Sequence, residues 1–135
     1  MTYIKECMIL TGRDSLQNIT GEVTETIRES KVQNGTVTVE SADSTAGILM
    51  IDSYGKEILD DITKEMRRIV PARINYLHQE SPENAAGHIK SALFGTSVSL
   101  IVKEGRLMCE GKKDVYFADY DGPQERSYVI CVVGE

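Results

Sequence analysis

The spacing of hydrophobic residues along the chain follows first the period of a strand and then that of a helix. Tyr3 to Leu10 is rich in β-forming residues and lacks Gly and Pro, and Gly12 and the polar residues after it end this first strand. Further apolar or alternating runs predict six more strands. They are Thr36–Val39, Gly47–Ile51, Ser97–Val102, Leu107–Glu110, Val115–Ala118 and Ser127–Val133.

Three segments carry helical spacing. Val23 and Ile27 lie four positions apart, as on one face of a helix. We expect Thr20 to cap the start of this short helix and Asn34-Gly35 to break the chain after it. The clearest helix is predicted over Lys56–Val70, before Pro71. Its apolar stripe consists of Ile58, Leu59, Ile62, Met66 and Ile69. A third helix is predicted from the Ser81-Pro82 start to Gly95.

The order of these elements predicts an α+β fold with antiparallel or mixed sheets and two to three helices, because helices cluster in the middle and strands follow one another afterwards. The length of 135 residues suits a single domain, over residues 1–135. We expect the strands after Gly95 to form one antiparallel sheet that packs against the apolar stripe of the Lys56–Val70 helix.

Composition narrows the functional classes. Hydrophobic residues make up 41% and charged residues 27%, as in ordinary globular proteins. The net charge of −6 disfavours nucleic acid as a partner. The chain has no apolar run long enough to span a membrane and no signal-peptide pattern at its start, so we expect a soluble, cytoplasmic protein without a membrane partner. Cys7, Cys109 and Cys131 suggest neither a disulfide framework nor a cysteine-rich zinc site.

Candidate chemistry centres on the two histidines, because the usual phosphate-loop, nucleophile-elbow and metalloprotease motifs are absent from the sequence. On the predicted third helix, Asn84, His88 and Ser91 fall on one polar flank, beside the apolar stripe. His78 lies shortly before this helix. We expect His78 and His88 to face one pocket, with Asn84 beside them.

Several motifs, in order, resemble the YjbQ family, to which secondary thiamine-phosphate synthase activity is ascribed. The resemblance covers nearly the whole chain. The motifs are Asp43-Ser44-Thr45-Ala46-Gly47-Ile48, Val70-Pro71, Tyr76-Leu77-His78, the segment from Asn84 to Ser97, Gly105-Arg106-Leu107, and Asp121-Gly122-Pro123 with Arg126.

The chain also departs from the family pattern. Asp43 replaces the first signature histidine, and Ile51-Asp52-Ser53-Tyr54-Gly55 replaces a stretch rich in Asn, Glu and Asp. Glu110-Gly111-Lys112-Lys113 stands where the family has Gly-Thr-Trp-Gln, and Gln124 stands where an arginine is usual. His78, Asn84, His88 and Arg126 keep the expected identities, so the chain resembles a divergent member.

The resemblance implies a homotrimer and an enzyme that joins a pyrimidine diphosphate to a thiazole phosphate, with loss of pyrophosphate. His78, Asn84 and His88 would then be catalytic, since imidazole exchanges protons near neutral pH. Ser44, Thr45 and Arg126 would bind the small phosphorylated ligand, and Lys112 or Lys113 could add positive charge. Because three signature segments are altered, we expect turnover to be weak or absent.

Two other functions remain open. In a non-catalytic binding module, Asp43, His78 and His88 would offer one carboxylate and two imidazoles to a divalent metal, either Zn²⁺ or Fe²⁺. Alternatively, the chain is a structural paralogue with a degenerate site, whose role is assembly alone.

Overall fold

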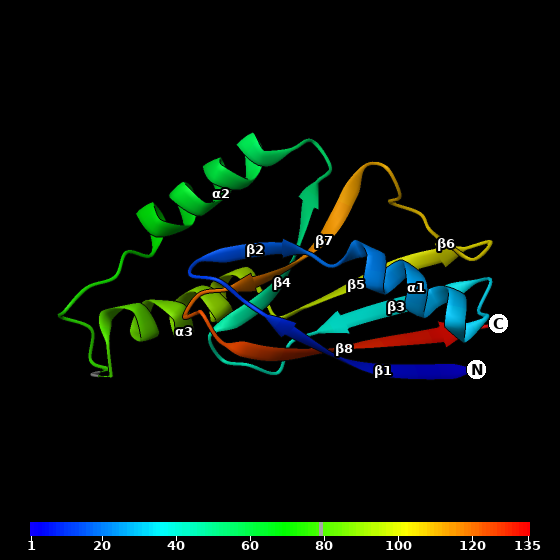
Figure 1. Cartoon of the computed structure of the whole chain (residues 1–135), viewed down its shortest axis with the longest axis horizontal. Coiled ribbons are helices and arrows are strands. Elements are labelled where there is room, and N and C mark those ends of the chain that lie inside the picture. Colours follow the sequence, from blue (N-terminus) through cyan, green and yellow to red (C-terminus); the bar gives the residue numbers. More distant parts are fainter. Residues whose placement is uncertain (79) are drawn as a thin grey trace.

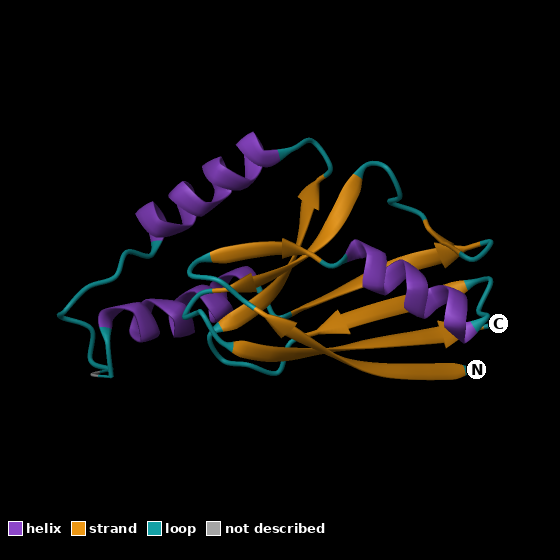
Figure 2. Ribbon diagram, viewed as in Figure 1, coloured by secondary structure: helices purple, strands orange, loops and turns teal. Residues whose placement is uncertain are grey.

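The computed structural model describes residues 1–78 and 80–135, and it confirms an α+β fold built on two antiparallel sheets (Figures 1 and 2). The strands are β1 (Thr2–Leu10), β2 (Ser15–Asn18), β3 (Gly35–Glu40), β4 (Ala46–Asp52), β5 (Ser97–Lys103), β6 (Arg106–Leu107), β7 (Lys113–Asp119) and β8 (Glu125–Gly134). The helices are α1 (Thr20–Ser30), α2 (Lys56–Ile69) and α3 (Pro82–Phe94).

The larger sheet has the strand order β1-β8-β3-β5-β6. Its long strands alternate buried and accessible residues, as a sheet covered on one face should. Helix α1 packs on the covered face against β8, β1 and β6. Val23 and Ile27 belong to the same hydrophobic core as Val37 of β3 and Ile130 of β8. The opposite face carries no helix in Figure 2.

The smaller sheet has the order β2-β7-β4 and receives α3 against β4. Ser91 of α3 donates a hydrogen bond to the Ala46 carbonyl of β4 at 2.7 Å. Gly87 and Gly47 permit the close approach, because a Cβ on Gly87 would lie 3.3 Å from the Tyr120 carbonyl oxygen and one on Gly47 only 2.6 Å from that of Gly95. This docking fixes α3 beside the end of β7.

Several predicted elements are confirmed with small shifts. Ser81 caps α3 as expected, since its hydroxyl accepts a 3.0 Å hydrogen bond from the Asn84 amide, and Pro82 takes the first helical position. Thr20 does not cap α1. Its hydroxyl instead accepts a hydrogen bond from the Val115 amide of β7, and the Asn18 side chain accepts one from the Thr20 amide.

One strand was missed and another is shorter than predicted. The strand β2 was not predicted, because its four residues between a turn and a helix are too few to show a period. The strand predicted over Leu107–Glu110 ends at Leu107, since the Leu107 carbonyl accepts a hydrogen bond from the Glu110 amide and turns the chain. Gly111 continues that turn with φ +80°.

The predicted partner of α2 is also wrong. The strands after Gly95 do not form one sheet, because β7 belongs to the smaller sheet and β5, β6 and β8 to the larger. No residue of α2 is fully buried, and Ile58, Ile62 and Met66 are only half-buried. The helix lies along the outside of the smaller sheet, as Figure 1 shows.

Candidate functional site

His78 and His88 meet although they come from different segments. His88 projects from α3, and His78 lies in the loop that leads into that helix. Their rings stand edge to face, with centroids 5.0 Å apart and an interplanar angle of 87°. The structure therefore brings together the two imidazoles that the sequence analysis placed in one pocket.

Asn84 holds the His78 ring. The Asn84 Oδ1 atom lies 2.6 Å from His78 Nε2, and the Asn84 Nδ2 group donates to the Asp121 carboxylate at 2.7 Å. A carboxylate only accepts hydrogen bonds, so the amide must turn its NH₂ group to Asp121 and its oxygen to His78. His78 Nε2 must then carry a proton, and in the neutral ring Nδ1 is the unprotonated nitrogen.

Beside the histidines lies an open hollow of ≈ 540 Å³. It is lined by Tyr76, Leu77, His78, Ala85, His88 and Ile89. Among the described residues the lining is mostly apolar and includes no lysine or arginine, so the two imidazoles are the basic groups of this lining. An apolar wall with a few polar groups is typical of small-molecule sites.

Arg126, which was expected to bind a ligand, is engaged inside the protein. Its side chain is 7% exposed, and it donates from Nε and from one terminal nitrogen to the Asp119 carboxylate, each at 2.9 Å. It also donates to the Thr45 hydroxyl at 2.8 Å, and its other terminal nitrogen lies 3.8 Å from an Asp43 oxygen. The hydrogen bond with Asp119 raises the pKa of Arg126, against the opposing effect of burial.

Asp119 and Asp121 are the site residues that the sequence analysis did not single out. Burial favours the neutral form of Asp119, but hydrogen bonds from Arg126, Thr11 and the Asp121 amide outweigh it and lower the pKa of Asp119. The Asp121 amide donates to Asp119 at 2.9 Å, which connects this pair to the Asn84–His78 contact. Asp121 belongs to the Asp121-Gly122-Pro123 motif of the resemblance, but no functional role was predicted for it, and Asp119 carried no signal beyond its place at the end of an apolar run.

The remaining predicted residues do not join the histidines. Asp43 faces Arg126, Ser44 is exposed, and Thr45 is buried against Arg126. Lys113 begins β7 and Asp119 ends it, so Lys112 and Lys113 lie about 20 Å from that end, at 3.3 Å per residue. The structure thus separates these lysines from the histidine hollow.

The proposed metal set is likewise not assembled in this chain. Over residues 1–78 and 80–135, no three His, Cys, Asp or Glu side chains are grouped so that they could hold a metal ion. Asp43 contacts Arg126, whereas His78 and His88 contact each other, and Glu80 lies 3.6 Å from His78. Over the same residues, no helix is long and apolar enough to cross a membrane.

Comparison with known sequences gives a consistent assignment. Residues 5–135 match the family described as UPF0047 protein YjbQ-like. A UPF0047 protein of Methanocaldococcus jannaschii is 31% identical over 123 residues, which cover 91% of this chain and 88% of the relative. The UPF0047 protein YugU of Bacillus subtilis is 29% identical over 124 residues, covering 92% and 93%.

Solved structures share the fold. A YbjQ-like protein of unknown function from Sulfolobus solfataricus superposes with a TM-score of 0.93 at 24% identity, covering 100% of this chain and 99% of the other. An uncharacterised YjbQ/UPF0047 protein of Clostridium acetobutylicum superposes with a TM-score of 0.90 at 28% identity, covering 96% and 99%. These structures show a shared fold, and the sequence match over residues 5–135 places the chain in the YjbQ-like, UPF0047 family.

Proposed function

We propose that this protein is an enzyme that performs acid–base chemistry on a small phosphorylated molecule in the hollow beside His78 and His88. The observation that supports the proposal is the chain of contacts from Asp121 through Asn84 to His78. Two oriented polar groups behind an imidazole are the usual means of fixing its tautomer and its direction. Such fixing is unnecessary for a histidine that only fills space at a surface.

The roles follow from the proton positions. Because His78 Nε2 donates to Asn84, Nδ1 of the neutral ring can accept a proton from a bound molecule and later return it. His88, in ring contact with His78, can supply a second imidazole as acid or as a cation. A phosphate group would be neutralised by protonated imidazole, since the lining formed by residues 1–78 and 80–135 includes neither lysine nor arginine.

For the reaction itself we propose transfer of the thiamine-phosphate synthase type, in which a pyrimidine diphosphate is joined to a thiazole phosphate and pyrophosphate is released. We expect the rate to be low. Arg126, which the resemblance assigned to the ligand, is bound by Asp119 and Thr45, and Lys112 and Lys113 lie at the far end of β7.

The test is release of pyrophosphate and formation of thiamine phosphate from the two precursors over several hours. The purified protein is compared with His78→Gln, His88→Gln and the control Lys112→Gln, which alters an exposed side chain far from the hollow. Slow product formation that is lost in both histidine variants and kept in the control supports the proposal. Equal product in all four proteins would point to a contaminating enzyme and contradict it.

A second candidate, a binding module without turnover, is favoured by the full engagement of Arg126. Without that cation, the hollow lacks the fixed positive charge that stabilises a departing pyrophosphate. If no product forms but pyrimidine diphosphate shifts the imidazole NMR signals of His78 and His88, the binding module replaces the enzyme. If neither product nor shift is found, both candidates fail.

We also propose that the chain assembles as a homotrimer through the uncovered face of the larger sheet. The face carries large apolar side chains that alternate with the buried ones. They are Ile4 (63% exposed), Met8 (65%), Ile101 (57%) and Val133 (45%). The register places Val133 and Ile101 in one row on either side of Thr36. Ile4 lies in the next row on that face, beside Cys131, and Met8 lies two rows beyond it, beside Ser127. Large exposed apolar side chains gathered on one face of a sheet mark an interaction face.

Light scattering tests the assembly at micromolar concentration. We expect a trimer mass for the parent protein and a smaller mass for Ile4→Lys. The control Ile74→Lys alters a side chain that is 90% exposed but lies in the loop before α3, so it should keep the trimer. A monomeric parent would refute the trimer. If Ile4→Lys stayed trimeric and Ile74→Lys did not, the interface would lie at the loop before α3 and not on the sheet.

A further inference from the structure

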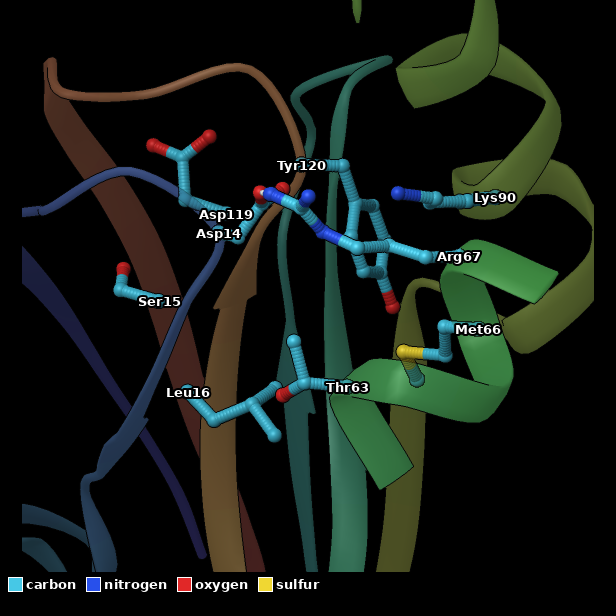
Figure 3. A pocket seen from close by; sticks show the side chains of 9 residues that line it. All are labelled: Asp14, Ser15, Leu16, Thr63, Met66, Arg67, Lys90, Asp119 and Tyr120. Atoms are coloured by element: carbon cyan, nitrogen blue, oxygen red, sulfur yellow. Dashed lines mark ion pairs between the residues drawn. The ribbon is translucent and has the colours of Figure 1, made fainter. Parts of the chain in front are cut away.

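A second polar site lies on the other side of α3 from the histidine hollow. Lys90 follows His88 by two positions, about 200° around the helix, so the two side chains leave on nearly opposite sides. Lys90 points into a small cavity between α2, α3 and the end of β7 (Figure 3). The cavity measures ≈ 10 Å³, room for roughly one oxygen-sized group.

Lys90 is buried without a counter-charge in contact. The residue is 4% exposed, and within the described residues its amine has no ion pair or hydrogen bond. Its Nζ lies 5.8 Å from the ring centre of Tyr120. Burial lowers the pKa of Lys90, the nearby charge of Arg67 lowers it further, and Glu83 partly opposes both. A lysine in this setting is costly for stability, and this cost needs an explanation.

Two other donors face the same space. The Tyr120 hydroxyl is buried and has no hydrogen-bond partner within the described part of the chain, and Tyr120 itself is 5% exposed. Arg67 reaches from α2 across the Tyr120 ring in Figure 3. Lys90, Tyr120 and Arg67 thus all line one cavity.

The carboxylates around the cavity are already bound. Asp14 pairs with Arg67, and Glu83 lies 3.6 Å from Arg13. Asp119 lines the cavity, but both of its oxygens accept hydrogen bonds from Arg126, and Figure 3 shows its carboxylate turned away from Lys90. Of the two cations that line the cavity, Arg67 is paired with Asp14, whereas no acidic side chain in the described residues forms an ion pair with Lys90.

We propose that Lys90, Arg67 and Tyr120 form a binding site for a small oxyanion, a phosphate group in particular. One oxygen of the anion would occupy the inner cavity, where it would accept from Lys90 and the Tyr120 hydroxyl. An adjoining hollow of ≈ 210 Å³ shares Asp14 and Tyr120 with the cavity and gives room for the rest of the group. Its other charged lining residues are Arg13, Glu83 and Asp121, and Asp121 accepts a hydrogen bond from Asn84. The anion supplies the missing counter-charge, and α2, with no fully buried residue, can yield to admit it.

The probe is inorganic phosphate, titrated into the folded protein at constant ionic strength and followed by the NMR amide signals of Lys90 and Tyr120. These local signals separate the site from any phosphate bound at the histidines, which are followed in the same spectra. We expect saturable shifts at millimolar phosphate or below. Lys90→Met should weaken binding at least tenfold, and Tyr120→Phe should weaken it several-fold.

Two further variants keep the test decisive. Arg67→Gln alters a half-exposed side chain on a peripheral helix, so it should fold and bind more weakly even if Lys90→Met does not fold. Lys112→Met removes an exposed lysine elsewhere and should bind as the parent does. Acetate replaces phosphate in a parallel titration, and tighter binding of acetate would assign the site to carboxylates. If phosphate at about 10 mM causes no shift, or if Lys90→Met binds phosphate as the parent does, the proposed phosphate site is wrong.

Discussion

Arg126 and Asp119 form a two-pronged ion pair at the junction of the two sheets, with both hydrogen bonds at 2.9 Å. Asp119 ends β7 and Arg126 lies near the start of β8, so the pair closes the turn that contains Asp121. That turn also supplies the carboxylate that orients Asn84. The ion pair therefore supports the geometry of the histidine site from behind.

Replacing Asp119 with Asn should lower the free energy of unfolding by about 3 to 5 kcal/mol, because it leaves the Arg126 charge buried without its partner. Chemical denaturation at pH 7 measures the change. The control Glu65→Gln breaks an exposed pair with Arg68 on α2 and should leave the midpoint unchanged. A loss no larger than that of the control would contradict a structural role for the pair.

The Arg126–Asp119 pair should also make the stability of the protein depend on pH. The pKa of Asp119 is lowered in the folded protein, so its contribution is complete above the unfolded pKa of about 3.9 and is lost as the pH falls through the folded value. The parent should lose stability below about pH 4 through this group, and Asp119→Asn should have a flatter profile there. Parallel slopes for the two proteins between pH 5 and pH 2 would refute this prediction.

A methyl group on Gly47 should be poorly tolerated. Its Cβ would lie 2.6 Å from the Gly95 carbonyl oxygen, and backbone cannot rotate aside as a side chain can. We expect Gly47→Ala to cost about 1 to 3 kcal/mol by separating α3 from β4. In Gly21→Ala the added Cβ meets nothing within 4 Å, and α1 should keep or gain stability. Thermal unfolding of both variants makes the comparison, and equal midpoints would contradict the steric argument.

The sequence was informative where a long segment carried one clear period. β1, β8 and the ends of α3 were predicted because apolar alternation, the Ser81 cap and Gly95 are local signals. The division into two sheets was not predictable in this way. It depends on β7 pairing with β2 and β4, which are separated from it by many residues and carry no mark of their partner.

For the candidate site, too, the sequence predicted only part of the arrangement. Helical geometry and the resemblance together singled out His78, Asn84 and His88, and the structure brings these side chains together. Asp119 and Arg126 bind each other across a turn, however, and no periodicity indicates that an arginine will be bound inside the protein instead of facing a ligand. A three-dimensional arrangement was needed to separate Asp43 from the histidines.

Helix α2 should open more readily than α1. Its apolar side chains are only half-buried, whereas α1 buries Val23, Thr26 and Ile27 against the sheets. Local opening needs less free energy where little apolar surface is lost from contact. Hydrogen exchange should therefore be faster across residues 58–68 than across residues 23–30, by tenfold or more. Equal protection of the two helices in the purified protein would show that another subunit or an unrecognised contact covers α2.

The last prediction concerns the proton on His78. Because Asp121 accepts from the Asn84 amide group and Asn84 Oδ1 faces His78, the neutral His78 ring should carry its proton on Nε2. In Asn84→Ala this preference should disappear, and in Asp121→Asn it should weaken, because an Asn side chain at position 121 can present either an acceptor or a donor to Asn84. Nitrogen-15 NMR of the imidazole rings distinguishes the tautomers directly, and the His88 signals serve as the internal reference. A parent protein with the proton on Nδ1 of His78 would overturn the orientation on which the acid–base proposal depends, and an unchanged tautomer in Asn84→Ala would show that another group sets it.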